Sequence, residues 1–148
     1  MHHLIRGARK KRGFTLVELL VVIVVLAVLA AIVLPKFMNS SARGRESALK
    51  SDLKLMRNAV TVFQADTNYC PATLADLAVT TAPAKGLDNA GTQQNIAAGD
   101  WHGPYLETVA KDPISGNDFT YGTASGSVGK VTSSASGNGL DGTAYSTW

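Results

Sequence analysis

The sequence contains a single cysteine, Cys70, and therefore no disulfide can form within the chain. Any folded region must be held together by packing or by a bound ion. Cys70 stands in a Tyr-Cys-Pro turn sequence, and nothing nearby resembles a base that would activate a thiol. We therefore interpret Cys70 as a small, partly buried apolar residue.

Histidine is also scarce, and the sequence offers no recognisable set of catalytic side chains. His102 is isolated, while His2 and His3 lie at the start of the chain. The aspartates share no spacing that would pair them as an acid and a base. We therefore expect that the protein is not an enzyme, and that Trp101 and Tyr105 pack a loop instead of forming a platform for a ligand.

Acidic residues are absent from residues 1–13, which carry five bases. Without these residues the chain has nine basic and eleven acidic residues, a balance of −2. Residues 36–57 carry six bases and two acids, whereas residues 58–148 carry three bases and eight acids. Because the bases are divided between two segments without aromatic residues among them, we expect no direct binding of nucleic acid.

The longest apolar run ends at Leu34 and has only one charged residue, Glu18. It is long enough to span a membrane as a helix. No small-x-small cleavage site follows it, unlike an ordinary secretory signal, and Gly13 lies before it. Processing at Gly13 would remove a basic leader, residues 1–13, and keep a hydrophobic helix, residues 14–35. The positive-inside rule places the leader in the cytoplasm and the carboxy terminus outside it.

Glu18 and Pro35 interrupt the apolar pattern. A carboxylate in an apolar segment is costly unless it is paired, so Glu18 predicts a partner; the alternative is that its side chain reaches the membrane surface. Proline removes a backbone hydrogen bond from a helix. Pro35 therefore predicts a kink or a locally unwound stretch over residues 31–35, and the alternative is that the helix ends there.

Apolar residues resume at helical spacing after Pro35 and predict one helix over residues 14–66, with an amphipathic half over residues 36–67. Toward its end, Leu55, Ala59 and Val62 are expected to widen the apolar stripe. The stripe itself follows a spacing of four, three, four and three residues at Leu49, Leu53, Met56, Val60 and Phe63.

Residues 68–148 predict a small head of the α+β class. The helix is expected to end at residues 68–71, a short helix or turn to follow at 73–79, and a loop to cover 80–99. Strands between glycine-rich turns are predicted to form a small antiparallel sheet on the amphipathic half of the helix, at residues 118–121, 130–134 and 144–148.

The sequence Gly13-Phe14-Thr15-Leu16-Val17-Glu18, between basic residues and an apolar helix, resembles the class III signal of type IV pilins and of the pseudopilins of type II secretion. Pro35 falls where that family has its helix-breaking proline. The resemblance implies the pilin fold, in which a long transmembrane and assembly helix packs on a small carboxy-terminal antiparallel sheet. It also implies that a prepilin peptidase cleaves after Gly13 and methylates Phe14, and that Glu18 neutralises the amino terminus of a neighbouring subunit.

Later motifs look like those of the major, G-type pseudopilin. This likeness implies a homopolymer that assembles from the inner (cytoplasmic) membrane, with an assembly platform and minor pseudopilins or pilins, into a periplasmic or extracellular filament that drives protein export. Two alternatives stay open: a type IV pilus pilin for adhesion, motility or DNA uptake, and a membrane-anchored binding domain that does not polymerise. The motifs are Gly103–Leu106, Lys111–Pro113, Phe119–Tyr121, Gly139–Gly142 and Trp148.

The same likeness implies a calcium ion bound by an acidic loop near the carboxy terminus. In this sequence only Asp118 and Asp141 are available there, among Ser, Thr, Gly and Ala. Calcium prefers six to eight oxygen ligands, so a site on these two residues would be weak. The alternative is that Asp141 serves an Asp-Gly turn with Gly142. We expect no other cofactor.

Overall fold

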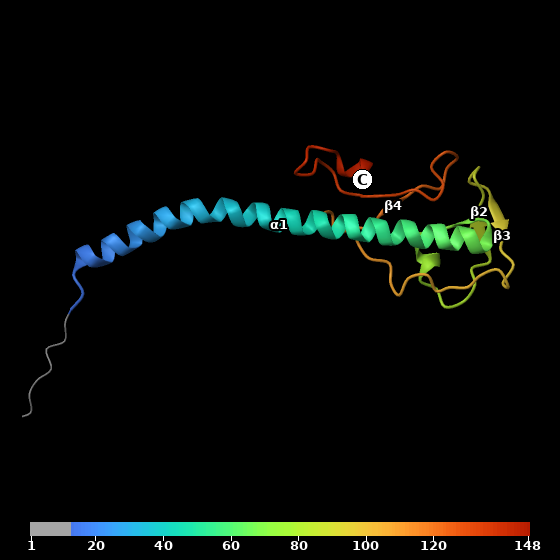
Figure 1. Ribbon diagram of the computed structural model, residues 1–148, viewed down its shortest axis with the longest axis horizontal. Coiled ribbons are helices and arrows are strands. Elements are labelled where there is room, and N and C mark those ends of the chain that lie inside the picture. Colours follow the sequence, from blue (N-terminus) through green and yellow to red (C-terminus); the bar gives the residue numbers. More distant parts are fainter. Residues whose placement is uncertain (1–12) are drawn as a thin grey trace, which may run out of the picture. The chain divides into compact units, whose positions relative to one another are not determined.

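The computed structural model describes residues 13–148, and of residues 35–39 it describes the backbone alone. The chain forms two compact units, one ending at Ser40 and the other running from Ser41 to Trp148 (Figure 1). The predicted leader, residues 1–13, lies outside the described residues except for Gly13.

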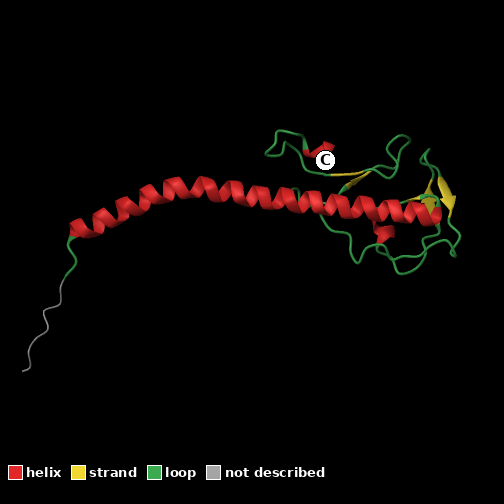
Figure 2. Ribbon diagram, in the orientation of Figure 1, coloured by secondary structure: helices red, strands yellow, loops and turns green. Residues whose placement is uncertain are grey.

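A single α-helix, α1, spans Leu16–Thr67 and contains 52 residues (Figure 2). It confirms the continuous helix that the apolar spacing predicts. The helix neither ends at Pro35 nor unwinds over residues 31–35, so both of these expectations are wrong. A kink at Pro35 stays a prediction.

The end of α1 has a local cause. The hydroxyl of Thr67 donates a hydrogen bond of 2.8 Å to the carbonyl of Phe63, one turn earlier. Asn68 then takes a φ of 62°, in the left-handed region that asparagine tolerates better than most residues. The helix therefore stops where the predicted turn at residues 68–71 begins.

The predicted apolar stripe of α1 forms the centre of the core of the second unit. Its five residues, from Leu49 to Phe63, are all buried, and Ala59 is buried beside them. Leu55 and Val62 are 55% and 49% exposed, so the expected widening of the stripe at these two positions is wrong. At about 100° per residue, both lie roughly 120–140° around the helix from the centre of the stripe.

The strands of the second unit form two small antiparallel sheets. The first has the order β1-β2-β3, and the second pairs β4 with β5, so that Tyr121 lies opposite Val131. A 3₁₀-helix, η1 (Leu74–Leu77), lies between β1 and β2 and confirms the predicted short helix. The strands are β1 (Cys70–Pro71), β2 (Lys85–Leu87), β3 (Gln93–Asn95), β4 (Thr120–Tyr121) and β5 (Val131–Thr132).

Two of the predicted segments of the head are wrong, one expected to be a loop and the other a strand. Residues 80–99, expected to be a loop, contain β2 and β3. Gly86 makes this pairing possible, because a Cβ atom there would lie 2.7 Å from the Cβ of Tyr69. Residues 144–148, expected to be a strand, instead contain the 3₁₀-helix η2 (Tyr145–Thr147), because the rings of Tyr145 and Trp148 pack edge to face, 5.1 Å apart, instead of pointing to opposite faces.

The second sheet lies against the amphipathic half of α1, as predicted. Val131 of β5 is buried in the core, and its carbonyl accepts hydrogen bonds of 3.0 and 2.8 Å from Nε and Nη2 of Arg57. A long amino-terminal helix packed on small antiparallel sheets is the α+β, pilin-like architecture that the sequence predicts.

Candidate functional site

The predicted processing site lies immediately before α1. Gly13, Phe14 and Thr15 have no regular secondary structure and are exposed. A Cβ atom at Gly13 would meet nothing within 4 Å. The chain's own fold therefore does not require glycine at this position, and a requirement for a small residue must come from a protein that acts on it.

Glu18 caps the helix that it belongs to. The backbone amide and the hydroxyl of Thr15 each donate a hydrogen bond of 3.0 Å to Glu18 Oε2, and the hydroxyl of Thr15 accepts one of 3.2 Å from the amide of Glu18. This reciprocal arrangement is a capping box, which satisfies backbone donors at the start of a helix. Our sequence analysis missed it, although the spacing Thr-x-x-Glu before an apolar run is its signature.

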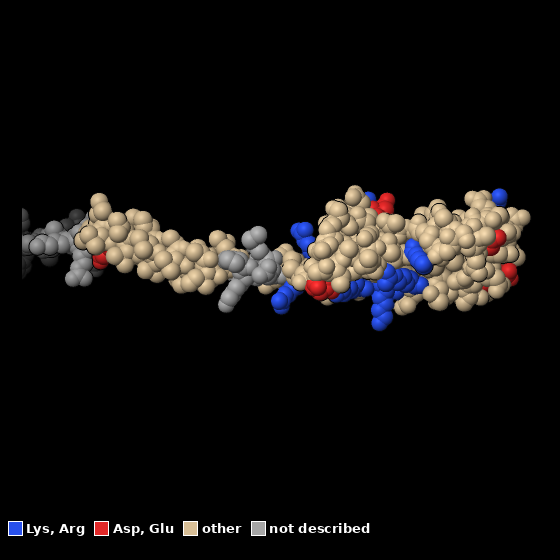
Figure 3. All heavy atoms as spheres, turned by 90° about the horizontal axis from the view of Figure 1, so that it is seen from above, with Lys and Arg blue, Asp and Glu red and all other residues tan. Residues whose placement is uncertain are grey.

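The apolar segment of α1, Leu16–Leu34, has 19 residues and a mean hydropathy of 3.3. It is long and apolar enough to cross a membrane, and none of it is buried within the structure. Figure 3 shows this segment as an almost uniformly uncharged surface between two grey stretches. The described part of the chain therefore leaves the apolar side chains of this segment exposed.

The predicted assembly residues were Phe14, Glu18 and Pro35. The recorded hydrogen bonds of Glu18 are with Thr15, which the prediction did not include, and Phe14 is 81% exposed. The pairing of Glu18 with the amino terminus of a second chain stays a prediction, as does the role of Pro35.

The predicted calcium ligands are occupied by other groups. Asp118 Oδ1 lies 3.5 Å from Lys111 Nζ, and both side chains are exposed. Asp141 Oδ1 accepts hydrogen bonds from the amide and the hydroxyl of Thr143, at 2.9 and 2.6 Å, and these bonds hold the pKa of Asp141 below its usual value. Among the described residues, no group of three or more His, Cys, Asp or Glu side chains could hold a metal ion. The donor set does not fit calcium, which needs six to eight oxygens, and the binding of calcium stays untested.

Asp112, which the sequence analysis named only as part of the motif Lys111–Pro113, organises the loops around the second sheet. Its side chain is fully buried. Burial raises its pKa, but hydrogen bonds outweigh burial and leave the pKa below the usual value. The donors are the hydroxyl of Ser133 and the amides of Ile114, Ser115 and Ser134, at 2.5, 2.8, 3.2 and 3.0 Å.

Tyr105 lies at the centre of an aromatic cluster. Its ring meets those of Phe63 and Trp101 edge to face, at 5.4 and 6.2 Å, which confirms the expected packing role. Its hydroxyl donates a hydrogen bond of 2.8 Å to Asp66. His102 lies 3.7 Å from the same carboxylate, whereas the sequence analysis expected His102 to be isolated. Burial, followed by the Asp66 carboxylate, raises the pKa of Tyr105, which makes its hydroxyl a poor nucleophile.

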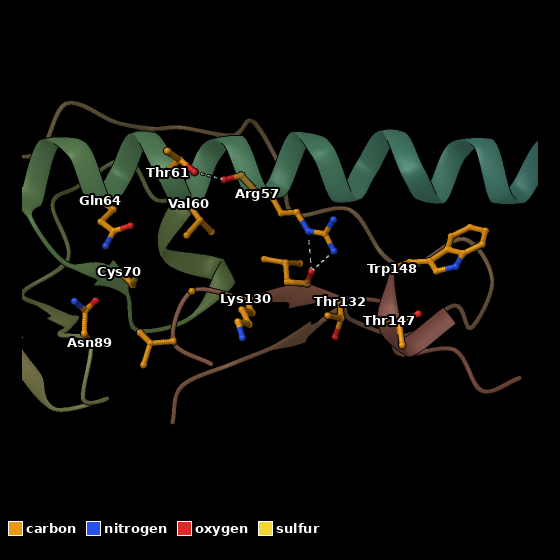
Figure 4. A pocket seen from close by; sticks show the side chains of 13 residues that line it. Arg57, Val60, Thr61, Gln64, Cys70, Asn89, Lys130, Thr132, Thr147 and Trp148 are labelled. Atoms are coloured by element: carbon orange, nitrogen blue, oxygen red, sulfur yellow. Dashed lines mark hydrogen bonds between the residues drawn. The ribbon is translucent and has the colours of Figure 1, made fainter. Parts of the chain in front are cut away.

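A cavity of about 450 Å³ lies where α1 meets β1, β5 and the end of the chain (Figure 4). Arg57 lines it, but its guanidinium is held by the carbonyl of Val131. Cys70 also lines it and is buried, and burial raises the pKa of its thiol. The cavity thus lies at a structural junction and contains no activated nucleophile.

Comparisons with known proteins match nearly the whole chain. Residues 8–34 match the family described as the prokaryotic N-terminal methylation motif, and residues 36–145 match the family described as type II secretion system (T2SS), protein G. The type II secretion system core protein G of Escherichia coli K12 is 32% identical over 114 residues, which cover 77% of this chain and 73% of that protein.

Two further relatives come from other bacteria. The core protein G of Vibrio cholerae is 31% identical and covers 76% of this chain and 71% of its own length. The type IV major pilin protein PilA of Myxococcus xanthus is 34% identical, over 62% of this chain and 40% of the pilin. No solved structure gives a significant match. The match over residues 36–145 and the coverage of the core proteins G show that this chain belongs to the protein G family of the type II secretion system.

Proposed function

We propose that this chain is the major pseudopilin of a type II secretion system, a structural subunit that polymerises into a short filament and thereby drives protein export. The observation that carries the proposal is the apolar segment Leu16–Leu34, none of which is buried within its own chain, directly after a matched N-terminal methylation motif. No catalytic role is proposed.

The apolar segment needs an environment other than water. Burying one large aliphatic side chain is worth roughly 1.5–3 kcal/mol, and the segment from Leu16 to Leu34 consists of such side chains and alanine apart from Glu18. A lipid bilayer satisfies the segment before assembly. The same segments of neighbouring copies satisfy it in a filament, so one surface serves both states.

Leu55 and Val62 support contacts between copies beyond the apolar segment. Both are about half exposed on α1, outside the stripe that packs the core of the second unit. They give the amphipathic half of the helix an apolar surface for a second copy of α1.

Processing removes the basic leader. A prepilin peptidase cleaves after Gly13, where the chain is exposed and without regular structure, and methylates the new amine of Phe14. The freed amine then lies close in sequence to the capping box of Thr15 and Glu18. In the filament, the Glu18 carboxylate pairs with the amine of a neighbouring Phe14, because a carboxylate surrounded by apolar helices is tolerated only when its charge is compensated.

The membrane orientation follows from charge. The five bases of residues 1–13 keep the leader in the cytoplasm, and the head lies on the other side of the inner membrane. From there the subunit joins the periplasmic filament through an assembly platform and minor pseudopilins.

Expression in a host with a complete type II secretion apparatus tests processing and export. The mature chain is expected to begin at Phe14 with a methylated amine, as read by mass spectrometry. Gly13→Leu is expected to keep the leader and to abolish secretion, whereas the control Gly44→Leu, at another glycine with open space around it, is processed normally. A chain that keeps residues 1–13 in such a host would contradict the proposal.

The match to a type IV major pilin favours a second candidate, an extracellular pilus subunit. The two functions differ in their products. Deletion of the gene is expected to stop the secretion of exoproteins without removing long surface fibres. Loss of such fibres with normal secretion would instead establish the pilus subunit. A membrane-anchored binding domain would form no filament in either case.

A further inference from the structure

The carboxy-terminal segment, residues 137–148, forms a turn that closes on itself. The amide of Gly139 donates to the carbonyl of Thr143 at 2.8 Å, and Asn138 forms a β-bridge with Ala144. The Asp141 carboxylate binds Thr143, as expected for the Asp-Gly turn. The indole of Trp148 donates to the hydroxyl of the same Thr143 at 2.5 Å. The segment thus has an internal hydrogen-bond network but needs an anchor to the rest of the head.

Glu46 of α1 supplies the first anchor. Its Oε1 atom accepts hydrogen bonds from the amide of Leu140 at 2.7 Å and from the hydroxyl of Tyr145 at 2.9 Å. Glu46 is only 8% exposed, and it lies three residues before Leu49, on the buried stripe of the helix. Hydrogen bonds to a carboxylate are shorter and stronger than those between neutral groups. One buried side chain therefore ties two points of the carboxy-terminal segment to α1.

Lys50 supplies the second anchor, one helical turn after Glu46. Its ammonium lies 3.9 Å from Asp141 Oδ2 and 4.1 Å from the centre of the Trp148 ring. A cation over an indole ring is attracted by the negative face of the ring. The positive charge beside the carboxylate of the turn therefore comes from a side chain of α1.

In the described part of the chain, the same arrangement leaves no cluster of acidic side chains for a divalent cation. One oxygen of Asp141 is engaged by Thr143, and the other faces Lys50. Gly139 cannot be replaced by an acidic residue without rearrangement, because its Cβ atom would lie 2.5 Å from Cζ2 of Trp148. Asp118 pairs with Lys111.

We propose that Glu46 and Lys50, the α1 anchor pair, fix the carboxy-terminal segment of this protein in place of a calcium ion, so that its head folds independently of calcium. The inference stands apart from the proposed function, because it concerns the folding of the head and is read out without filament assembly. The anchor pair and the turn that it holds form one unit, and among the described residues no cluster of carboxylates stands ready for calcium.

Thermal unfolding of the full chain in detergent micelles, followed by near-UV circular dichroism and tryptophan fluorescence, tests the inference. The melting temperature of the unaltered protein is expected to be the same with excess EGTA and with millimolar calcium chloride. A calcium-dependent rise that Asp141→Asn abolishes would overturn the inference, and this arm requires no variant of the anchor pair.

Variants of the anchor pair form the second arm. Glu46→Gln is expected to lower the melting temperature by roughly 4–8 °C, since the segment loses its charge-assisted bonds. Lys50→Met, which keeps the aliphatic stem, is expected to lower it less and to change the Trp148 emission. The controls Glu107→Gln and Lys54→Met alter exposed residues of the same types and should change neither. Anchor variants that behave like their controls would overturn the inference. If Glu46→Gln does not fold, Lys50→Met and the calcium arm still decide.

Discussion

The two halves of α1 differ in how much apolar side chain they carry and in what covers it. In the half from Leu16 to Leu34 the large apolar residues are all exposed, whereas in the other half one stripe from Leu49 to Phe63 is buried by the head. The first half is apolar around its whole circumference, and the second has a single stripe with bases on other faces. One continuous helix thus carries an apolar surface that the chain leaves exposed, which we propose contacts lipid or other copies, and an apolar stripe that the chain itself buries.

The largest effect is expected at Glu18, the only charged residue of the first half. Glu18→Ala should abolish filaments seen by electron microscopy, because the amine of a neighbouring Phe14 would lose its carboxylate. The melting temperature of the head should not change, since the described contacts of Glu18 are with Thr15 in the first unit. Glu107→Ala, at an exposed acid of the head, is the control. Normal filaments from the Glu18 variant would contradict the pairing of Glu18 with the amine of a neighbouring Phe14.

A matched pair of leucines tests the comparison directly. Leu49 is fully buried and Leu26 is 59% exposed on the same helix. Leu49→Ala should cost about 2–5 kcal/mol of unfolding free energy, as large-to-small changes in cores do. Leu26→Ala should leave that free energy unchanged and affect membrane insertion or assembly instead. Denaturant titration of the full chain in micelles measures both, and equal losses would mean that the halves are not distinct.

The dependence of stability on pH tests the role of Asp112 in the head. Its folded pKa lies below the usual value of 3.8, so its contribution to stability is present above about pH 4 and is lost as the pH falls through the folded value. Asp112→Asn should cost roughly 1–3 kcal/mol at neutral pH, because a buried acceptor of four hydrogen bonds loses its charge. The variant should also lose less stability than the unaltered protein on acidification. Asp88→Asn, at a half-buried carboxylate whose pKa is lowered by a hydrogen bond from Gln94, should have the smaller effect. A steeper acid loss in the Asp112 variant would contradict this assignment.

The fold could be predicted where the regular spacing of apolar side chains along the sequence indicates a helix or a strand. The stripe from Leu49 to Phe63 followed from spacing alone, but Glu46 continues the same rhythm and was missed because the pattern was read through apolar residues only. Strands β2 and β3 were unpredictable for another reason. They have three residues each and largely polar side chains, and they are held by backbone pairing and by the close approach that Gly86 allows.

The grouping of Gly13, Phe14 and Glu18 rests on a sequence motif and stays a prediction. The three residues lie close together in sequence, so no tertiary structure was needed to group them. The anchoring of residues 137–148 depends on contacts across 94 and 99 residues of sequence, between Glu46 and the amide of Leu140 and the hydroxyl of Tyr145. Strand-forming residue types at 144–148 pointed to a sheet, but the packing of Tyr145 against Trp148 decided otherwise.

The smallest effect is expected at Asp118, the other acid considered for calcium. Its side chain is 82% exposed and its partner Lys111 is 67% exposed, so the ion pair is screened by water and salt. Asp118→Asn should therefore leave the melting temperature unchanged, both with EGTA and with calcium chloride, whereas Glu46→Gln lowers it in both. The contrast separates Asp118, an acid considered for calcium from the sequence alone, from Glu46, an acid that holds the carboxy-terminal segment. A calcium-dependent rise in melting temperature that disappears in the Asp118 variant would contradict this prediction. It would mean that a calcium ion, and not Glu46 and Lys50 of α1, holds the carboxy-terminal segment.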